Sequence, residues 1–243
     1  MLRWCGVKLV SPQTLALAQL WSVLIDLALA GMLAFLLVDR LAPPQDLPWK
    51  PFSLNQPIGL ATAGKLAVIA ADPVKCRAAL TAGGIAFVDQ PVREKGYCST
   101  GDTLRAPSRL VPKAPVMTCP LALRYALWER QVVGPKAREI LASPVVRIDQ
   151  LGTYACRTIY GRTGARPSEH ARANALDVAG FRTADGRRIT VLKDFAKDTP
   201  EGRFVRAARD GACRIFGVTL SPDYNAEHAD HLHLNPAGYS LCR

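Results

Sequence analysis

The longest hydrophobic run of the chain lies close to its beginning. It extends from Leu15 to Val38, and polar side chains interrupt it only at Gln19, Ser22 and Asp26. A helix that crosses the hydrocarbon core of a bilayer needs about 20 residues. The run is longer than this, so it predicts one transmembrane helix over residues 15–38.

Basic residues before the run set its expected orientation. Arg3 and Lys8 precede it, and basic residues favour the cytoplasmic side of a membrane. We therefore predict a single-pass inner-membrane protein with a cytoplasmic tail over residues 1–14 and a periplasmic C-terminal domain. The alternative is a cleaved signal peptide with an apolar core over residues 27–38, but no Ala-x-Ala-like cleavage site follows that core.

A proline-rich segment follows the hydrophobic run. Residues 39–60 contain five prolines, Pro43, Pro44, Pro48, Pro51 and Pro57. Proline lacks a backbone donor and favours extended conformations. We therefore predict a stiff linker that holds a folded domain, residues 61–243, away from the bilayer.

Shorter apolar runs and helical spacings alternate through the rest of the chain. Helical patterns cover residues 74–80, 120–141 and 201–216, with stops at Gly83-Gly84 and Gly217 and a break at Gly134-Pro135. Residues 66–70 form a strand or a packed arm. Further strands are predicted over residues 85–88, 145–148, 153–157, 175–179, 188–192 and 230–234, with turns at Gly152 and Asp185-Gly186. This mixture predicts an α+β domain in which helices flank a small antiparallel sheet.

Charge narrows the class of partner. The net charge is +11 at pH 7, which predicts an anionic partner. Nucleic acid is the usual partner of so basic a chain. The predicted membrane anchor and the cysteines that follow it favour an exported domain instead, so no nucleic acid partner is expected.

All four histidines lie in two short segments. His170 precedes Asp177 by seven residues, and His228, His231 and His233 follow near the C-terminus. A catalytic zinc ion takes about three protein ligands, from neutral imidazole and carboxylate groups, and leaves one position for water. His170, Asp177 and one later histidine supply such a set. The alternative is that these groups only hydrogen-bond to one another at a polar surface.

The predicted strands support this set of ligands. Side chains alternate along a strand, so an extended segment over residues 230–234 places His231 and His233 on the same face. Asp177 lies in the strand predicted over residues 175–179. Two imidazoles beside a carboxylate on a neighbouring strand would form a metal site.

Cysteines are divided by the hydrophobic run. Cys5 precedes it and is expected to be cytoplasmic and reduced, whereas six cysteines follow it: Cys76, Cys98, Cys119, Cys156, Cys213 and Cys242. An even number on the exported side predicts three disulfides among many possible pairings. We expect Cys213 to pair with Cys242, because this bond would pin the C-terminus beside the histidines. No Cys-x2-Cys spacing occurs, so a structural zinc site made of cysteines is not expected.

The first histidine segment resembles a peptidase motif. The Ser-x-His-x-x-Gly-x-Ala-x-Asp motif of zinc D-Ala-D-Ala carboxypeptidase-type peptidases is similar to Ser168-x-His170-x-x-Ala173-x-Ala175-x-Asp177. The later His231-x-His233 resembles the His-x-His of the wider group that includes lysostaphin-like enzymes and the hedgehog signalling domain.

Most of the chain also resembles the C-terminal domain of bacterial extensin-like proteins, from about Cys76 to Cys242. Four segments carry this resemblance: Cys119-Pro120-Leu121-Ala122, Ser168-Glu169-His170, Asn174 to Phe181 and Asp230 to Leu234. The resemblance implies a relative of the zinc peptidases that cut cell-wall peptides.

This resemblance implies a role for each residue around the metal. His170, Asp177 and His233 would bind Zn2+. Ser168 would orient a ligand without touching the ion, and His228 would flank the ligands.

The expected catalytic base is less well defined than the metal site. Asp230 stands where the peptidases usually carry Glu, and Leu232 replaces their usual aromatic residue. Family position favours Asp230 as the proton acceptor, whereas strand alternation favours His231. Ala173 replaces the motif glycine, a small change if the backbone there keeps a negative φ.

Arginines are dense around the first histidine segment: Arg157, Arg162, Arg166, Arg172, Arg182, Arg187 and Arg188. Guanidinium groups bind carboxylates and stabilise oxyanions, and the stem peptides of peptidoglycan are rich in carboxylates. The resemblance gives Arg157 the place of the peptidase arginine near the substrate. The alternative is a solvated basic face.

We therefore predict a membrane-anchored zinc peptidase, of carboxypeptidase or endopeptidase type, that hydrolyses peptide bonds of peptidoglycan. Two other functions stay open. One is a non-catalytic cell-wall-binding domain that retains the metal, and the other is a module that binds polyanions through charge alone.

Overall fold

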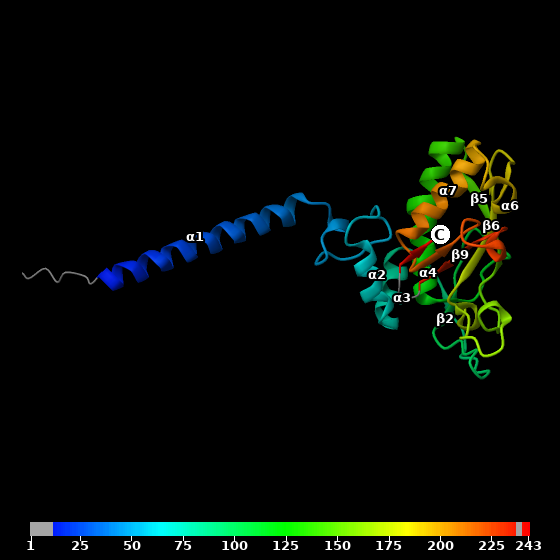
Figure 1. The fold of residues 1–243 in the computed structure, drawn as a ribbon, viewed down its shortest axis with the longest axis horizontal. Helices are drawn as coiled ribbons and strands as arrows, with labels where there is room; N and C mark the ends of the chain where they lie inside the picture. Colours follow the sequence, from blue (N-terminus) through cyan, green and yellow to red (C-terminus); the bar gives the residue numbers. More distant parts are fainter. Residues whose placement is uncertain (1–11, 237–239) are drawn as a thin grey trace, which may run out of the picture. The chain divides into compact units, whose positions relative to one another are not determined.

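A computed structural model describes residues 12–236 and 240–243 of the chain. Most of the predicted cytoplasmic tail, including Arg3, Cys5 and Lys8, lies outside the described residues. The chain divides into two compact units, one that ends at Pro43 and one that runs from Pro44 to Arg243 (Figure 1).

The first unit contains helix α1, Pro12–Leu41. Within Gln13–Leu41 the mean hydropathy reaches 2.2. At about 1.5 Å per residue, this helix exceeds the ~30 Å hydrocarbon core of a bilayer. By length and composition it is therefore able to cross a membrane, as the hydrophobic run predicts.

The second unit begins with the proline-rich segment, which packs on the domain instead of forming a free linker. Leu47 and Leu54 are buried, and Leu54 belongs to the main hydrophobic core. Gln131 Nε2 donates a hydrogen bond to the Leu54 carbonyl at 2.8 Å. The two leucines between the prolines supply this burial, so the folded unit starts at Pro44 and not at residue 61.

Two short helices follow, α2 at Thr62–Ala70 and α3 at Pro73–Ala82. Helix α3 confirms the helical pattern predicted over residues 74–80. The strand or packed arm predicted over residues 66–70 is wrong, since these residues complete α2. Three- and four-residue spacing explains the difference, because Thr62, Lys65 and Leu66 share the buried face of the helix.

A small antiparallel sheet is formed by β1, Val88–Asp89, β2, Thr103–Arg105, and β4, Met117–Thr118, in the order β1-β2-β4. The strand predicted over residues 85–88 is therefore reduced to its last residue. Strands β2 and β4 are too short to produce an alternating pattern in the sequence.

The longest helical stretch of the second unit runs from Cys119 to Leu141. It comprises α4, Cys119–Trp128, a π-helical stretch, Glu129–Val133, α5, Gly134–Lys136, and a second π-helical stretch, Ala137–Leu141. The break predicted at Gly134-Pro135 is wrong. A wider π-helical turn accommodates a proline, whose ring otherwise meets the carbonyl four residues earlier.

The larger sheet contains seven strands within the described residues, in the order β10-β8-β9-β6-β5-β3 with β7 also paired to β6. Its strands are β3, Leu110–Val111, β5, Val145–Gly152, β6, Leu176–Thr183, β7, Arg188–Thr190, β8, Val218–Leu220, β9, Leu232–Asn235, and β10, Leu241–Cys242. β3 pairs with β5, and β8 with β10, in parallel; the other pairs are antiparallel. The α+β class is as predicted, but this sheet is mixed.

Two predicted strands have different ends in the structure. Strand β5 continues through Gly152, and residues 153–157 form no second strand. Strand β7 ends at Thr190, whose hydroxyl caps the short helix α6, Val191–Asp194, by accepting a hydrogen bond from Lys193 N at 3.2 Å. The strand therefore ends before the apolar run does, because the Thr190 cap starts a helix there.

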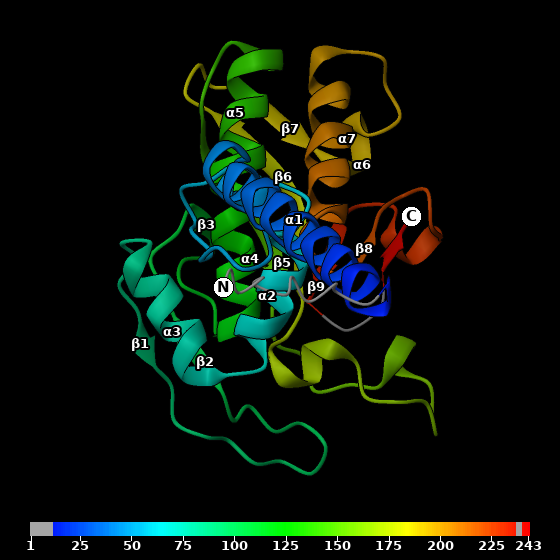
Figure 2. The same cartoon turned by 90° about the vertical axis from the view of Figure 1, so that its left-hand side faces the viewer.

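The core lies between the larger sheet and the helices that cover it. Helix α7, Pro200–Cys213, confirms most of the helix predicted over residues 201–216. Phe181 of β6 packs against Trp128 of α4 and Phe204 of α7, with ring centroids 6.1 and 5.0 Å away. Figure 2 shows α5 and α7 in front of the strands that carry this face.

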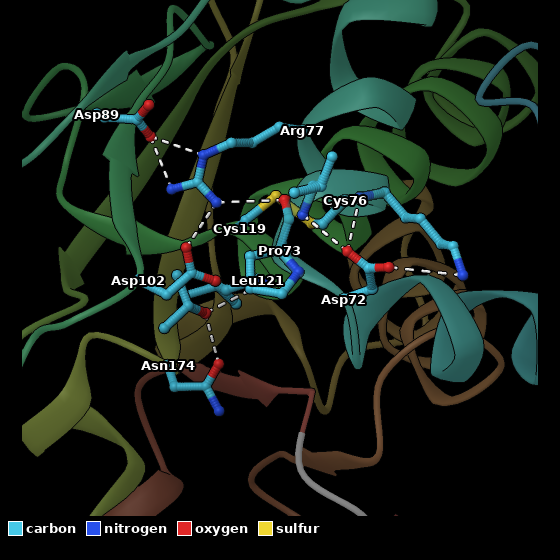
Figure 3. The surroundings of a disulfide bond; sticks show 12 residues. Asp72, Pro73, Cys76, Arg77, Asp89, Asp102, Cys119, Leu121 and Asn174 are labelled. Carbon is cyan, nitrogen blue, oxygen red and sulfur yellow. Dashed lines mark hydrogen bonds and ion pairs between the residues drawn. A yellow bond between two sulfur atoms is a disulfide. The ribbon is translucent and has the colours of Figure 1, made fainter.

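Three disulfides tie the second unit together: Cys76–Cys119, Cys98–Cys156 and Cys213–Cys242. The last confirms the predicted pair, and it joins the end of α7 to β10. The first joins α3 to α4. Beside it, Arg77 forms ion pairs with Asp89 at 2.7 Å and Asp102 at 2.6 Å (Figure 3).

Candidate metal centre

Strand register brings two of the predicted ligands together. β6 and β9 are antiparallel neighbours, and Asp177 lies directly opposite His233. The flanking Leu176, Val178, Leu232 and Leu234 are fully buried. Because successive side chains point to opposite faces, this burial directs Asp177 and His233 to the other face of the sheet.

His170 comes from a short 3-10 helix, Glu169–Arg172, that precedes β6. The Ser168 hydroxyl caps this helix by accepting a hydrogen bond from the His170 backbone N–H at 3.3 Å. The helix ends at Ala173, whose φ of 55° is left-handed. The condition under which the replacement would be a small change, a negative φ at Ala173, is therefore not met, and the turn has the conformation that glycine adopts most easily.

The three candidate ligand groups lie close together, with the two Asp177 oxygens next to different imidazoles. His170 Nε2 lies 3.1 Å from Asp177 Oδ2 and 3.2 Å from His233 Nδ1. His233 Nδ1 lies 2.9 Å from Asp177 Oδ1. Ligand atoms of a tetrahedral zinc ion, each about 2.0–2.1 Å from it, lie about 3.3 Å from one another. Both the donor types and their spacing therefore fit a zinc ion.

The surroundings keep Asp177 and His233 in the protonation states that a metal requires. Burial alone would raise the pKa of Asp177, but hydrogen bonds with His170 and His233 hold this pKa well below its usual value. Burial lowers the pKa of His233, although Asp177 acts in the opposite direction. At neutral pH Asp177 is therefore ionised and His233 is neutral, as metal coordination demands.

His231 stands beside this group without belonging to it. Its Nε2 lies 3.5 Å from Asp177 Oδ1, and its Nδ1 lies 2.8 Å from Asp230 Oδ1. The Asp230 side chain is 55% exposed and touches the side of the ring that faces away from Asp177. The two candidate bases therefore form a pair in which His231 is nearer to the ligand atoms.

His228 is buried behind His231. Its Nδ1 lies 2.6 Å from Asn225 Oδ1, and its ring centroid lies 5.1 Å from that of His231. Burial lowers the pKa of His228 to about 4. A neutral imidazole at this position flanks the ligands and does not reach the point where they converge.

Three of the four histidines line a cleft of about 770 Å³. Its wall includes His228, His231, His233 and the aromatic residues Tyr160 and Tyr224. A hydrogen bond from Asn225 Nδ2 to the Tyr160 hydroxyl, 3.1 Å long, joins two loops of this wall. A cleft of this size is typical of small-molecule and peptide-segment sites.

Three of the predicted arginines line the cleft: Arg157, Arg166 and Arg172. All three are exposed, and none pairs with a carboxylate among residues 12–236 and 240–243. Three uncompensated guanidinium groups beside the ligands make the cleft suitable for an anionic ligand.

The other four predicted arginines do not line the cleft. Arg182 pairs with Asp149, and Arg187 pairs with Asp185 and Glu201. Arg188 lies opposite Arg182 at the β6–β7 end of the sheet. Arg162 packs over the Tyr160 ring, 5.3 Å from its centroid. The expectation that all seven surround the site is wrong, because the β6–β7 hairpin carries three of them away from the ligand end of β6. Arg162 contacts a residue of the cleft wall without lining the cleft itself.

A family model described as "Extensin-like protein C-terminus" matches residues 74–243. The chain belongs to the extensin-like family. The matched region of this extensin-like chain contains the candidate metal centre, the three disulfides and every residue named in the cleft. No curated protein and no solved structure matches the chain.

One residue of the extensin-like site has no signal in the sequence pattern. Asn235 is buried, and its Nδ2 position lies 3.1 Å from His233 Nε2, the ring nitrogen that faces away from Asp177. The two-residue spacing on β9 places both side chains on one face. Its position two residues after a candidate ligand would have indicated that it shares a face with His233, but not that the two side chains are in contact.

Proposed function

We propose that this protein is a zinc-dependent peptidase, anchored in the inner membrane, that hydrolyses peptide bonds in peptidoglycan. The convergence of His170 Nε2, Asp177 and His233 Nδ1 within 3.2 Å of one another carries the proposal. Two imidazoles and a carboxylate are the donors expected of a catalytic zinc ion, and one of the three groups, His233, lines the open cleft.

His170, Asp177 and His233 would hold the ion. When bound, zinc would lower the pKa of a water molecule and polarise the carbonyl of the scissile bond. The chain's contribution is to fix three donors on a rigid strand pair and a capped turn. Buried leucine and valine neighbours prevent these side chains from turning away.

His231 is the residue that we assign as the proton acceptor. Its Nε2 faces the ligand group, and Asp230 accepts a hydrogen bond from its Nδ1. A carboxylate in this position fixes the tautomer that leaves Nε2 free to take a proton from water and to deliver it to the leaving amine. Asp230 then acts as a positioning residue through His231.

The cleft arginines would bind the carboxylates of the substrate. Arg157, Arg166 and Arg172 line the same wall as the histidines. Peptidoglycan stem peptides carry several carboxylates, and guanidinium groups bind such groups through paired hydrogen bonds. Arg157, which precedes the histidine turn, is the residue that we assign to the reacting peptide.

Helix α1 and the disulfides support the proposed location. The helix is long and apolar enough to span a bilayer, and disulfides persist in the periplasm but are rare in the cytosol. An N-terminus in the cytoplasm and a C-terminal domain in the periplasm would satisfy both observations. The basic Arg3 and Lys8 favour the same orientation.

The test begins with metal content. The full chain is purified under oxidising conditions, loaded with zinc, dialysed and analysed for bound metal. We expect one zinc ion per chain in the native protein, and none in His170→Ala or Asp177→Asn. Asp198→Asn is the matched control, because its side chain is 92% exposed and lies away from the site.

The second step measures the release of new amino groups from purified peptidoglycan. We expect release that chelation abolishes, and a decrease of about 10²-fold or more in His231→Gln with zinc retained. Zinc binding without release would favour a cell-wall-binding domain that keeps the metal. Absence of zinc would show that the metal site is wrong. Binding to peptidoglycan that depends steeply on salt and needs no metal would favour the polyanion-binding module.

A further inference from the structure

The outer face of helix α2 is apolar along its whole length. Leu60, just before the helix, is 91% exposed, and Val68 is 64% exposed. Every exposed residue on this side of the segment is apolar: Leu60, Ala63, Gly64, Ala67, Val68 and Ala71. At 100° per residue these positions form one continuous stripe opposite the buried face of the helix.

An exposed helix face of a globular domain is normally polar. Helix α2 contains one charged residue, Lys65, and it is buried. Its ammonium donates a hydrogen bond to the Pro44 carbonyl at 2.7 Å. The only charged side chain of α2 therefore points into the domain. The exposed face of the helix is left apolar, as is typical of a helix face that another surface covers.

Only a short length of chain joins the hydrophobic helix to the folded unit that carries α2. The apolar run ends at Val38, and the folded unit begins at Pro44. Asp39 to Leu41 add about 5 Å of helix, and the path from Leu41 to Pro44 covers at most about 11 Å. Pro44 therefore lies within about 16 Å, along the chain, of the point where the apolar run ends.

Helix α2 is bonded directly to this first part of the folded unit. Besides the contact between Lys65 and Pro44, the Leu60 N–H donates to Asp46 Oδ1 at 2.7 Å. The Ala61 N–H donates to the Gln45 carbonyl at 3.2 Å. Three consecutive residues, 44–46, thus hold the apolar segment at the place where the chain enters the domain.

We propose that the outer face of α2, together with Leu60, lies on the surface of the lipid bilayer. An apolar face of this kind is buried about 5–10 Å into the boundary between headgroups and acyl chains. The contact would hold the domain in one orientation above the membrane. This inference rests on the proposed insertion of α1, and its test separates the two.

The test uses the full chain in lipid nanodiscs, with Cys5→Ser so that the introduced cysteine is the one that carries the label. An environment-sensitive fluorophore is attached at Val68→Cys, or at Leu192→Cys as the control. The control side chain is equally exposed, at 64%, and belongs to α6 in another part of the domain. A third probe at Leu29→Cys, in the middle of α1, reports insertion of that helix.

Lipids that carry a quencher near the headgroup end of the acyl chain are then introduced. We expect about a twofold loss of fluorescence at Val68, together with a shift of emission to shorter wavelength, and neither change at Leu192. The additional substitution Ala67→Glu should abolish the quenching at Val68 without changing the melting temperature.

The other outcomes separate the bilayer contact of α2 from the membrane insertion of α1. If the Leu29 probe is quenched by a deep quencher and the Val68 probe by no lipid quencher, the bilayer contact is wrong while the anchor stands. A blue-shifted but unquenched Val68 probe would assign the face to a protein partner such as a second copy. If the Leu29 probe is unquenched, the proposed anchor itself fails.

Discussion

Asp177 and His233 face each other across β6 and β9, and the Asp177 carboxylate accepts a hydrogen bond from His233 Nδ1 at 2.9 Å. In this state the proton of the imidazole is on Nδ1, so Nε2 accepts from the Asn235 amide at 3.1 Å. A metal bound at Nδ1 would require the proton to be on Nε2, and the Asn235 side chain would then serve as its acceptor through the amide oxygen.

Asn235 is therefore expected to control the affinity of the site for zinc. Asn235→Leu removes the acceptor for the Nε2 proton and should weaken zinc binding by about 10- to 100-fold. Asn235→Asp supplies a permanent acceptor and should restore or strengthen it. Competition with a chelator of known affinity measures the change, and ¹⁵N shifts of the His233 ring report the tautomer.

The control for this experiment is Asn225→Ala. Asn225 also hydrogen-bonds a histidine, but that histidine is His228, which is not a predicted ligand. Equal losses of zinc affinity in the Asn225 and Asn235 variants would show that general disturbance of the histidines, and not the tautomer of His233, is responsible.

Leu54 tests whether the proline-rich segment belongs to the fold. Its side chain is 1% exposed and is part of the main core. Leu54→Ala should lower the free energy of unfolding by about 2–5 kcal/mol, because it removes buried carbon and leaves a cavity. Leu60→Ala, at a position that is 91% exposed, should change it little. Denaturant titration of both variants makes the comparison, and a free linker would give two small, equal effects.

Two alanines with left-handed backbone provide a second stability test. Ala142 and Ala173 have φ of 52° and 55°, and this conformation costs a non-glycine residue about 1–2 kcal/mol. Ala142 is exposed, so Ala142→Gly should raise the free energy of unfolding by about 1 kcal/mol. Ala173 is fully buried, so Ala173→Gly also loses a packed methyl group, worth about 0.8 kcal/mol, and should be close to neutral. A larger gain at Ala173 than at Ala142 would contradict this explanation.

The Cys213–Cys242 disulfide holds the C-terminal strand beside the cleft. Leu241 of β10 lines the cleft, and β10 pairs with β8 through only two residues. Replacing both cysteines by alanine opens a 29-residue loop and should lower the free energy of unfolding by about 3.5 kcal/mol. Hydrogen exchange should show loss of protection at Leu241, while Asp177 and His233 stay protected. Unchanged exchange at Leu241 would mean that strand pairing alone holds β10.

Local patterns were sufficient for several features. The apolar run predicts α1, the helical spacing that starts at Pro120 predicts α4, and the turn at Asp185-Gly186 predicts the β6–β7 hairpin. These features depend on residues that are neighbours in the chain. Their geometry is therefore set by short-range periodicity and turn chemistry.

Packing between distant segments explains the errors. Leu47 and Leu54 stand alone among prolines, so only the completed core makes their burial favourable. The strand predicted over residues 66–70 becomes part of α2 because its neighbours require a helical face there. The parallel pairing of β10 with β8 joins segments that share no local signal.

The sequence by itself determined which groups were candidates for the site: four histidines in two clusters, an aspartate seven residues after the first, and six cysteines beyond the hydrophobic run. Only the tertiary structure decided that Asp177 lies opposite His233, that His231 faces the ligands while Asp230 supports it, and that Asn235 contacts the outer nitrogen of His233. The physical reason is that strand register and side-chain distance depend on how the whole core packs. Residue identity fixes which bonds are possible, and packing selects those that form.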